Sequence, residues 1–244
     1  FGKEKRMNKR GKTIMMLCLT VLLLGAYSVK AAGNTGYSTT LELTGMEKNG
    51  TFYLHYPSGE LAASIPRELA TSGFPASEPP AEGETASFPV SVFFGGNGKG
   101  LEWAVVCSGP SAGLCNTNVL LSKASGESWK LISSCENTPH ELVTGAGFRD
   151  ERTGFLSCRY TQDAGPVIYA TQDGGSSWER LPVAEGYDGF SKTPGSPVMT
   201  AQSVWFPVVL RDEAGNETTV YYSSQDMETW SWGENDCRGG LGHP

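Results

Sequence analysis

The chain has few of the residues and motifs that mark a catalytic or metal-binding site. Its 244 residues include three histidines, and none of its six cysteines belongs to a Cys-x-x-Cys pair of the kind that binds zinc. The motifs Gly-x-Ser-x-Gly and His-Glu-x-x-His are absent, and so is a phosphate-binding loop. The sequence therefore predicts no metal site, no cofactor and no nucleophile–base pair that local sequence would mark.

Basic residues are scarce beyond the first thirty positions. Seven of the 19 lysines and arginines lie at or before Lys30, against one of the 26 acidic residues, which leaves 12 basic and 25 acidic residues and a net charge of −13. A chain of this sign repels phosphate backbones. We therefore expect no nucleic-acid partner, and an anionic glycan only through a local arginine cluster.

Only one long apolar run is present, from Thr13 to Tyr27. It is shorter than the ~20 residues that a membrane-spanning helix needs. Basic residues follow Met7 and small residues close the run at Ala31 and Ala32, a pattern typical of a cleaved secretory signal peptide. We assign residues 1–31 to a leader and signal peptide, and expect a secreted or cell-surface protein with no stable membrane anchor after cleavage.

Five cysteines lie beyond the signal peptide, and an exported chain can form disulfides. Cys107 and Cys115 are close enough in sequence to cross-link one hairpin, and Cys135 with Cys158 could link adjacent strands. Cys237 is left over. It is a free thiol, an intermolecular partner or the partner of a cysteine beyond the printed sequence, and we favour the last.

The sequence has little helical pattern after the leader. The best candidate, Leu61 to Thr71, is interrupted by Pro66. Short β-branched and aromatic runs recur instead between Gly, Asn and Asp, which indicates an all-β fold. The Asn-Gly pair at 49–50 favours a hairpin between residues 41–43 and 51–56.

Three repeats follow an N-terminal segment and a linker. Residues 32–71 form the N-terminal segment, a possible diverged hairpin or blade, and residues 72–87 are rich in Pro, Glu, Ala and Ser, which indicates a linker or long loop. Residues 88–244 hold the repeats. Each repeat opens with an aromatic-containing strand and ends on a turn with a Trp, at 129, 178 and 230. Periods of 49 and 52 residues with strand-only content are typical of propeller blades.

The turn that ends the second repeat, residues 171–178, has the sequence Thr-Gln-Asp-Gly-Gly-Ser-Ser-Trp. It resembles the Asp-box (BNR) family, whose pattern is Ser/Thr-x-Asp-x-Gly-x-Thr/Ser-Trp. The other turns are degraded copies, because Ala124 takes the Asp position in the first, and the third is one residue short and lacks the Gly. The matching residues are Ser122, Gly126 and Trp129; Thr171, Asp173, Gly175 and Trp178; and Ser224, Asp226 and Trp230.

The resemblance implies a secreted β-propeller of about four-stranded Asp-box blades, in the superfamily of sialidases and sortilin-type receptors. In such a box the Asp accepts backbone N–H groups and the Gly supplies a positive φ, while the Trp folds back under the turn. The boxes therefore lock hairpins and lie away from the ligand site. Three blades are fewer than the roughly four to eight of a closed propeller. Either residues 34–71 form a diverged blade or the chain is incomplete, and we favour the second.

The resemblance leaves two functions open. A sialidase needs an arginine triad, a Tyr nucleophile activated by a Glu, and an Asp acid/base. The triad's first arginine normally precedes an Ile-Pro pair, where this chain has Ser64, with Arg67 after the Pro instead. The leading hypothesis is a non-catalytic binding module for a glycan or an extracellular protein; the alternative is a fragment of an exported sialidase-like glycoside hydrolase. Arg159 and Tyr160 are the predicted ligand-facing pair.

Overall fold

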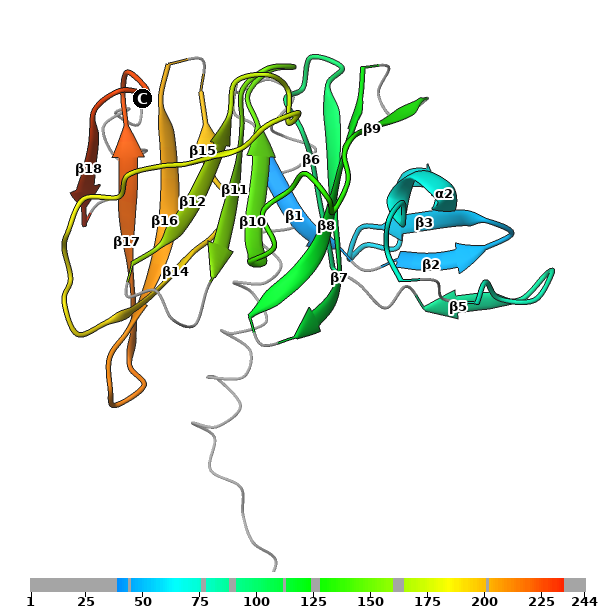
Figure 1. Ribbon diagram of the computed structural model, residues 1–244, viewed down its shortest axis with the longest axis horizontal. Coiled ribbons are helices and arrows are strands. Elements are labelled where there is room, and N and C mark those ends of the chain that lie inside the picture. The colour runs from blue at the N-terminus through cyan, green and yellow to red at the C-terminus, as the bar shows by residue number, and fades with distance from the viewer. Residues whose placement is uncertain are drawn as a thin grey trace, which may run out of the picture.

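The described part of the chain folds into four antiparallel β-sheets and one short helix, which confirms the predicted all-β class (Figure 1). The computed structural model describes residues 39–43, 45–75, 78–87, 91–111, 113–123, 128–159, 165–200 and 202–234. No helix in these ranges is long and apolar enough to span a membrane. The predicted signal peptide and Cys237 lie outside them.

The first sheet, sheet N, has the strand order β4-β3-β2-β5, and sheet I the order β1-β6-β7-β8-β9. Sheet II has the order β10-β11-β12-β13 and sheet III the order β14-β16-β17-β18, with β15 also paired to β16. The elements are β1 (Thr39–Leu43), β2 (Gly45–Lys48), β3 (Thr51–His55), β4 (Leu61–Pro66), α2 (Arg67–Ala70), β5 (Thr85–Ser87), β6 (Ser91–Gly96), β7 (Glu102–Ser111), β8 (Leu114–Ser122), β9 (Trp129–Ser133), β10 (Leu142–Phe148), β11 (Gly154–Arg159), β12 (Val167–Thr171), β13 (Glu179–Arg180), β14 (Ser191–Pro194), β15 (Val198–Met199), β16 (Val204–Arg211), β17 (Glu217–Ser224) and β18 (Trp230–Gly233).

Sheets I, II and III correspond to the three sequence repeats. In each, a run of strands that follow one another along the chain are hydrogen-bonded neighbours, namely β6 to β9, β10 to β13 and β16 to β18, so each repeat contains a meander. The box sequence lies each time in the connection between the last two strands, at 122–129, 171–178 and 224–230. The repeat found in the sequence is therefore also a repeat of structure.

The N-terminal hairpin forms at the predicted turn but with a different partner strand. Asn49 and Gly50 have φ angles of 50° and 75°, as a two-residue turn of this kind requires. A two-residue turn pairs Lys48 with Thr51, so β3 pairs with β2. Strand β1, the predicted partner, pairs instead with β6 in sheet I. Strand β5, inside the predicted linker, completes sheet N by pairing with β2.

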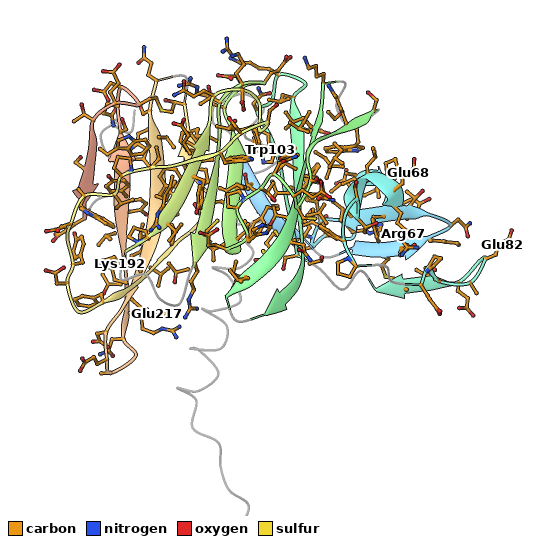
Figure 2. The ribbon with its side chains drawn as sticks, in the orientation of Figure 1. Arg67, Glu68, Glu82, Trp103, Lys192 and Glu217 are labelled. Carbon is orange, nitrogen blue, oxygen red and sulfur yellow. The ribbon has the colours of Figure 1, made fainter. Side chains whose placement is uncertain are left out.

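The sheets pack as successive layers with a hydrophobic core at each contact. On β7, Trp103 and Val105 face sheet II while Ala104 and Val106 face sheet N, because successive side chains of a strand point to opposite faces. Figure 2 shows Trp103 inside the layers. Sheet II contacts sheet III through Phe155, whose ring centroid lies 5.4 Å from that of Phe206. The strands of sheet N run across the direction of the other strands in Figure 1.

A close backbone approach joins sheets II and III. A Cβ on Gly145 of β10 would lie 2.3 Å from the backbone nitrogen of Ser196, so only glycine fits there. Ser157 lies on the neighbouring strand β11, and its hydroxyl donates a hydrogen bond of 2.7 Å to the Gly195 carbonyl. Sheet III therefore starts against the first two strands of sheet II.

A buried amide joins sheet N to sheet I. Asn118 of β8 is fully buried, and its Nδ2 donates to the carbonyl oxygens of Ala70 and Ser72 at 3.0 and 2.9 Å. Its Oδ1 accepts the Cys135 N–H at 3.0 Å. One side chain therefore bonds the end of α2 and the connection between β9 and β10 at the same time.

Candidate functional site

The box of sheet II is a closed set of hydrogen bonds around Asp173. The Thr171 hydroxyl donates to Asp173 Oδ1 at 2.8 Å and accepts the Gly175 N–H at 2.8 Å. The N–H and hydroxyl of Ser177 donate to the same carboxylate at 2.9 and 2.7 Å. Gly175 has a φ of 99°. The Trp178 ring packs against Phe148 of the same sheet, with centroids 6.1 Å apart.

The box of sheet III repeats this arrangement with a shorter turn. The Ser224 hydroxyl donates to Asp226 Oδ1 at 3.0 Å, and the N–H and hydroxyl of Thr229 donate to the Asp226 carboxylate at 2.7 and 3.0 Å. Met227 has a φ of 68°, so it adopts the positive φ that Gly175 supplies in the box of sheet II. Trp230 stacks on Tyr222 at 5.5 Å.

In the first box only the flanking residues lie in the described ranges. Ser122 is buried, and Trp129 packs against Phe94 of β6 with centroids 6.3 Å apart. Residues 124–127, which include Gly126 and the Ala124 that replaces the Asp, lie outside the described residues. Each of the three tryptophans therefore packs against an aromatic residue of its own sheet.

The electrostatics of the two complete boxes argue against acid–base chemistry. The Ser177 hydroxyl, followed by the Ser177 N–H and the Thr171 hydroxyl, lowers the pKa of Asp173 to about 2. The backbone N–H groups of Thr229 and Glu228 likewise lower the pKa of Asp226. A general acid needs a pKa near the working pH. Both carboxylates therefore stay ionised and act as acceptors for their own turns.

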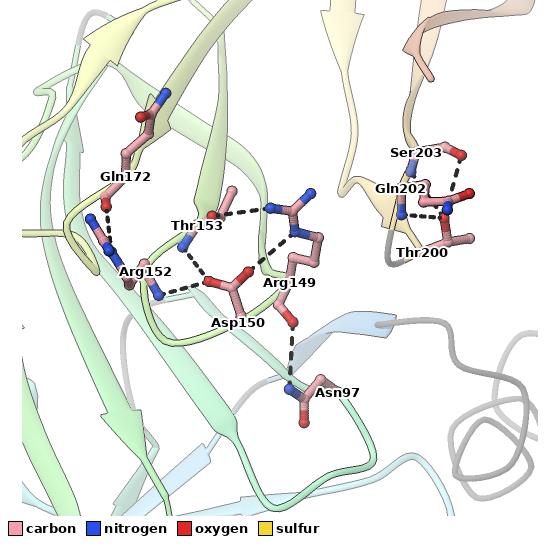
Figure 3. Close-up of polar contacts among 9 residues, drawn as sticks. All are labelled: Asn97, Arg149, Asp150, Arg152, Thr153, Gln172, Thr200, Gln202 and Ser203. Carbon is pink, nitrogen blue, oxygen red and sulfur yellow. Dashed lines mark hydrogen bonds and ion pairs between the residues drawn. The ribbon is translucent and has the colours of Figure 1, made fainter. Parts of the chain in front are cut away.

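The end of the sheets at which the boxes lie, here called the box end, also carries the turns between β6 and β7 and between β10 and β11. The second of these turns is closed by its own hydrogen bonds (Figure 3). Asp150 accepts the N–H groups of Arg152 and Thr153 at 2.9 and 2.8 Å. The Arg149 Nε donates to the same carboxylate at 3.2 Å. Asn97, from the matching turn of sheet I, donates to the Arg149 carbonyl at 3.5 Å.

At the opposite end of sheets I and II, residues from different hairpins meet. Leu114 forms a bridge with Glu141, and Leu142 pairs with Arg159 across β10 and β11. The Tyr169 hydroxyl donates to Glu141 Oε1 at 2.6 Å, and Arg180 pairs with Tyr169 across β12 and β13. We call this group the hairpin-end site, and its members are Leu114, Glu141, Arg159, Tyr169 and Arg180.

The hairpin-end site combines an apolar surface with three kinds of polar group. Leu114 is 43% exposed, and Arg159 and Arg180 are exposed, whereas Glu141 and Tyr169 are half-buried. Burial, followed by the bond to Glu141, raises the pKa of Tyr169 well above its usual value. The phenol therefore keeps its proton and donates a hydrogen bond to the carboxylate. The described residues contain no group of three or more His, Cys, Asp or Glu side chains placed to hold a metal ion.

Sequence reasoning found part of this site and missed the rest. Arg159 of the predicted ligand-facing pair lies exposed at the end of β11, and Tyr160 lies outside the described residues. Glu141 and Tyr169 were not predicted, because 28 residues separate them and neither belongs to a local motif. Only the pairing of distant strands brings the carboxylate to the phenol.

The cysteines correct the predicted disulfides. Cys107, Cys115, Cys135 and Cys158 are all free thiols. The predicted Cys135–Cys158 disulfide does not form, because the two cysteines lie in different parts of the fold. The Cys135 Sγ donates to the Gly73 carbonyl at 3.3 Å, whereas Cys158 lies in the core between sheets I and II. Cys107 and Cys115 lie in that same core as free thiols, with the Thr117 hydroxyl 3.4 Å from the Cys115 sulfur and 3.9 Å from the Cys107 sulfur.

Comparison with known proteins gives little further guidance. No family model matches the chain, and no curated protein matches it. Among solved structures the chain is similar to Zg3597, a family 117 glycoside hydrolase produced by the marine bacterium Zobellia galactanivorans, at 12% sequence identity and a TM-score of 0.35. The match covers 82% of this chain and 70% of that one. A similarity of this degree carries no conclusion about function.

Proposed function

We propose that the chain is an extracytoplasmic binding module, built from Asp-box propeller blades, that recognises a glycan or a protein without catalysing a reaction on it. The observation that carries the proposal is the contrast between the two ends of the sheets. At the box end, Asp150, Asp173 and Asp226 are occupied by their own turns. At the other end, exposed Leu114 and Arg159 lie beside the Tyr169–Glu141 pair.

The propeller part of the proposal rests on the repetition of one structural unit. Three successive meanders carry a box in the same connection, and each packs its face on the next through an aromatic residue, as Trp103 does on Phe148 and Phe155 on Phe206. Sheets that repeat in this way are typical of blades. The export part rests on the signal-peptide pattern at residues 1–31.

The chemistry of the hairpin-end site suits a neutral, hydroxyl-rich or peptide ligand. An exposed leucine offers apolar contact, and the two arginines can donate hydrogen bonds to hydroxyl, carbonyl or carboxylate oxygens. Glu141 accepts hydrogen bonds. Because the chain is acidic overall, any anionic group on the ligand must reach these arginines locally.

A binding screen with a matched pair of variants tests the proposal. The purified chain is applied to arrays of glycans and of extracellular proteins, and hits are titrated by calorimetry. We expect Arg159→Ala to weaken binding about tenfold, the loss of one charge-assisted hydrogen bond. Arg152→Ala removes an exposed arginine from the box end and should leave affinity unchanged. Equal losses in both variants would contradict a site at the hairpin end.

A second function, that of an exported glycoside hydrolase, is favoured by one specific observation. The 2.6 Å bond joins the two residue types, Tyr and Glu, that serve as nucleophile and base in the sialidase resemblance. The raised pKa of Tyr169 opposes this role, and Ser64, at the arginine position of that resemblance, lies in sheet N on β4. Turnover of fluorogenic sialosides that is lost in both Tyr169→Phe and Glu141→Gln would overturn the binding-module proposal.

A further inference from the structure

Sheet III has one face that no described sheet covers. On β16 the side chains of Phe206, Val208 and Leu210 pack in the core with residues of sheet II, so the odd-numbered side chains of this strand point away from sheet II. The neighbouring strands extend this face, because directly opposite residues of an antiparallel pair share a face. We call it the outer face of sheet III, and its members are Val198, Trp205, Pro207, Val209, Thr219 and Tyr221.

The repeat of the fold marks the outer face as a packing surface. The second residue of β7 is Trp103, which packs on Phe148 of sheet II with centroids 6.0 Å apart. The second residue of β11 is Phe155, which packs on Phe206 of sheet III. The same position of β16 is Trp205, which points away from sheet II. Sheets I and II therefore use this face to bind the next sheet, and sheet III offers the same face without a described sheet to bind.

The centre of the outer face carries no charge, although the chain is acidic. Trp205 is largely covered at 8% exposure, whereas Pro207, Val209 and Tyr221 beside it are half-buried and still accessible. The charged residues that β16 and β17 place on this side form an ion pair with each other at the rim, Arg211 with Glu217. The last repeat of a stacked array normally has a polar outer face. Aromatic residues without charges are instead typical of the core of a protein–protein interface.

We propose that the outer face of sheet III packs on the same face of a second copy of this chain and forms a two-fold dimer. Two-fold dimers, in which identical surfaces meet, are the commonest soluble oligomers. Beyond Lys30 each chain has a net charge of −13, so two copies repel each other over most of their surfaces and can meet at a face without charge. The inner faces would interdigitate as in a β-sandwich. The dimer does not depend on the function proposed above.

The size of the outer face predicts a weak, reversible dimer. The strands β14 to β18 contain 26 residues. At a rise of ~3.3 Å per residue and a strand spacing of ~4.8 Å, they cover roughly 400 Å² per copy, or about 800 Å² in the pair. Interfaces of this size are weak and transient. We therefore expect a dissociation constant on the order of tens of micromolar.

Sedimentation velocity of the purified chain over about 1 to 300 µM tests the proposal. We expect the weight-average mass to rise with concentration toward twice that of one chain. Thr219→Asp adds a carboxylate at an exposed position opposite Val209, and should raise the concentration of half-association more than about tenfold. Val209→Asp should have at least the same effect. Met46→Asp is the matched control, because it adds the same charge at a 43% exposed apolar residue of sheet N, and should leave association unchanged.

Circular dichroism and denaturation of each variant at low concentration separate loss of the dimer from loss of the fold. If Val209→Asp unfolds the chain, Thr219→Asp decides, since its side chain is exposed and makes no part of the core. A parent chain that stays monomeric at every concentration would overturn the proposal. Association that Met46→Asp weakens as much as Thr219→Asp does would overturn it as well. No ligand is present in this experiment, so a failure of the dimer and a failure of the binding function are distinguishable.

Discussion

The box turns and the long-range contacts satisfy their polar groups in different ways. In the box of sheet II, every bond to Asp173 comes from a residue two to four positions away in the chain. In the long-range contacts the partners are distant: 28 residues separate Tyr169 from Glu141, which lies next to β10 of the same sheet, and 48 separate Asn118 from Ala70. The boxes therefore close as soon as one hairpin forms, whereas the long-range contacts exist only when several strands or whole sheets have come together.

The largest effect should come from the most buried of the long-range contacts. Asn118→Ala leaves the Ala70 and Ser72 carbonyls and the Cys135 N–H without their partner, and should lower the free energy of unfolding by about 3 kcal/mol. The measurement is chemical denaturation followed by tryptophan fluorescence. Asn116→Ala, a half-buried position on the same strand, is the control and should cost under about 1 kcal/mol. Equal losses would mean that the strand, and not the amide, joins the sheets.

The contact at the hairpin-end site should rank second. Tyr169→Phe removes one hydroxyl and leaves the half-buried Glu141 carboxylate without its 2.6 Å donor, at a cost of about 1.5 kcal/mol. The same denaturation experiment measures it. Tyr221→Phe changes a half-buried tyrosine in sheet III and should be nearly silent. An effect of Tyr169→Phe no larger than this control would indicate that water replaces the donor without loss.

The difference in sequence distance also explains what the sequence could predict. The box residues around Asp173 were predicted because their bonds are local, and the all-β class was predicted because strand patterning is local as well. The turn at Asn49 and Gly50 has the predicted conformation. Its partner strand was misassigned because the alternatives, β1 and β2, are adjacent in sequence, and the two-residue turn length decides between them.

The candidate site was less predictable for the same reason. Arg159 was chosen because it follows a recognisable strand, but nothing near Tyr169 or Glu141 in sequence marks them as partners. The cysteines show the limit most clearly. Their spacing pointed to two disulfides, whereas three of the thiols share one core and Cys135 lies in another place, a grouping that depends on the packing of sheet I on sheet II.

A smaller effect is expected from a box, since its groups are exposed and water can replace lost bonds. Asp173→Ala removes the acceptor for the Ser177 N–H and hydroxyl and should cost about 1 kcal/mol, similar to the loss of a helix cap. Native-state hydrogen exchange should show the loss at the 171–178 turn and β13, with sheet I unaffected. Asp188→Ala, an exposed aspartate outside any box, is the control. Loss of protection across all sheets would contradict the local character of the box.

The smallest effect should be the acid dependence of that same turn. Because the folded pKa of Asp173 is lowered to about 2, its contribution to stability is complete above the unfolded value near 3.9 and is lost as the pH falls toward 2. The parent chain and Asp173→Asn should therefore differ in unfolding free energy at pH 6, and the difference should shrink between about pH 4 and pH 2. Solvent screening of this exposed carboxylate keeps the change small. A difference that stayed constant down to pH 2 would mean that the bonds from Ser177 do not depend on the charge of the carboxylate.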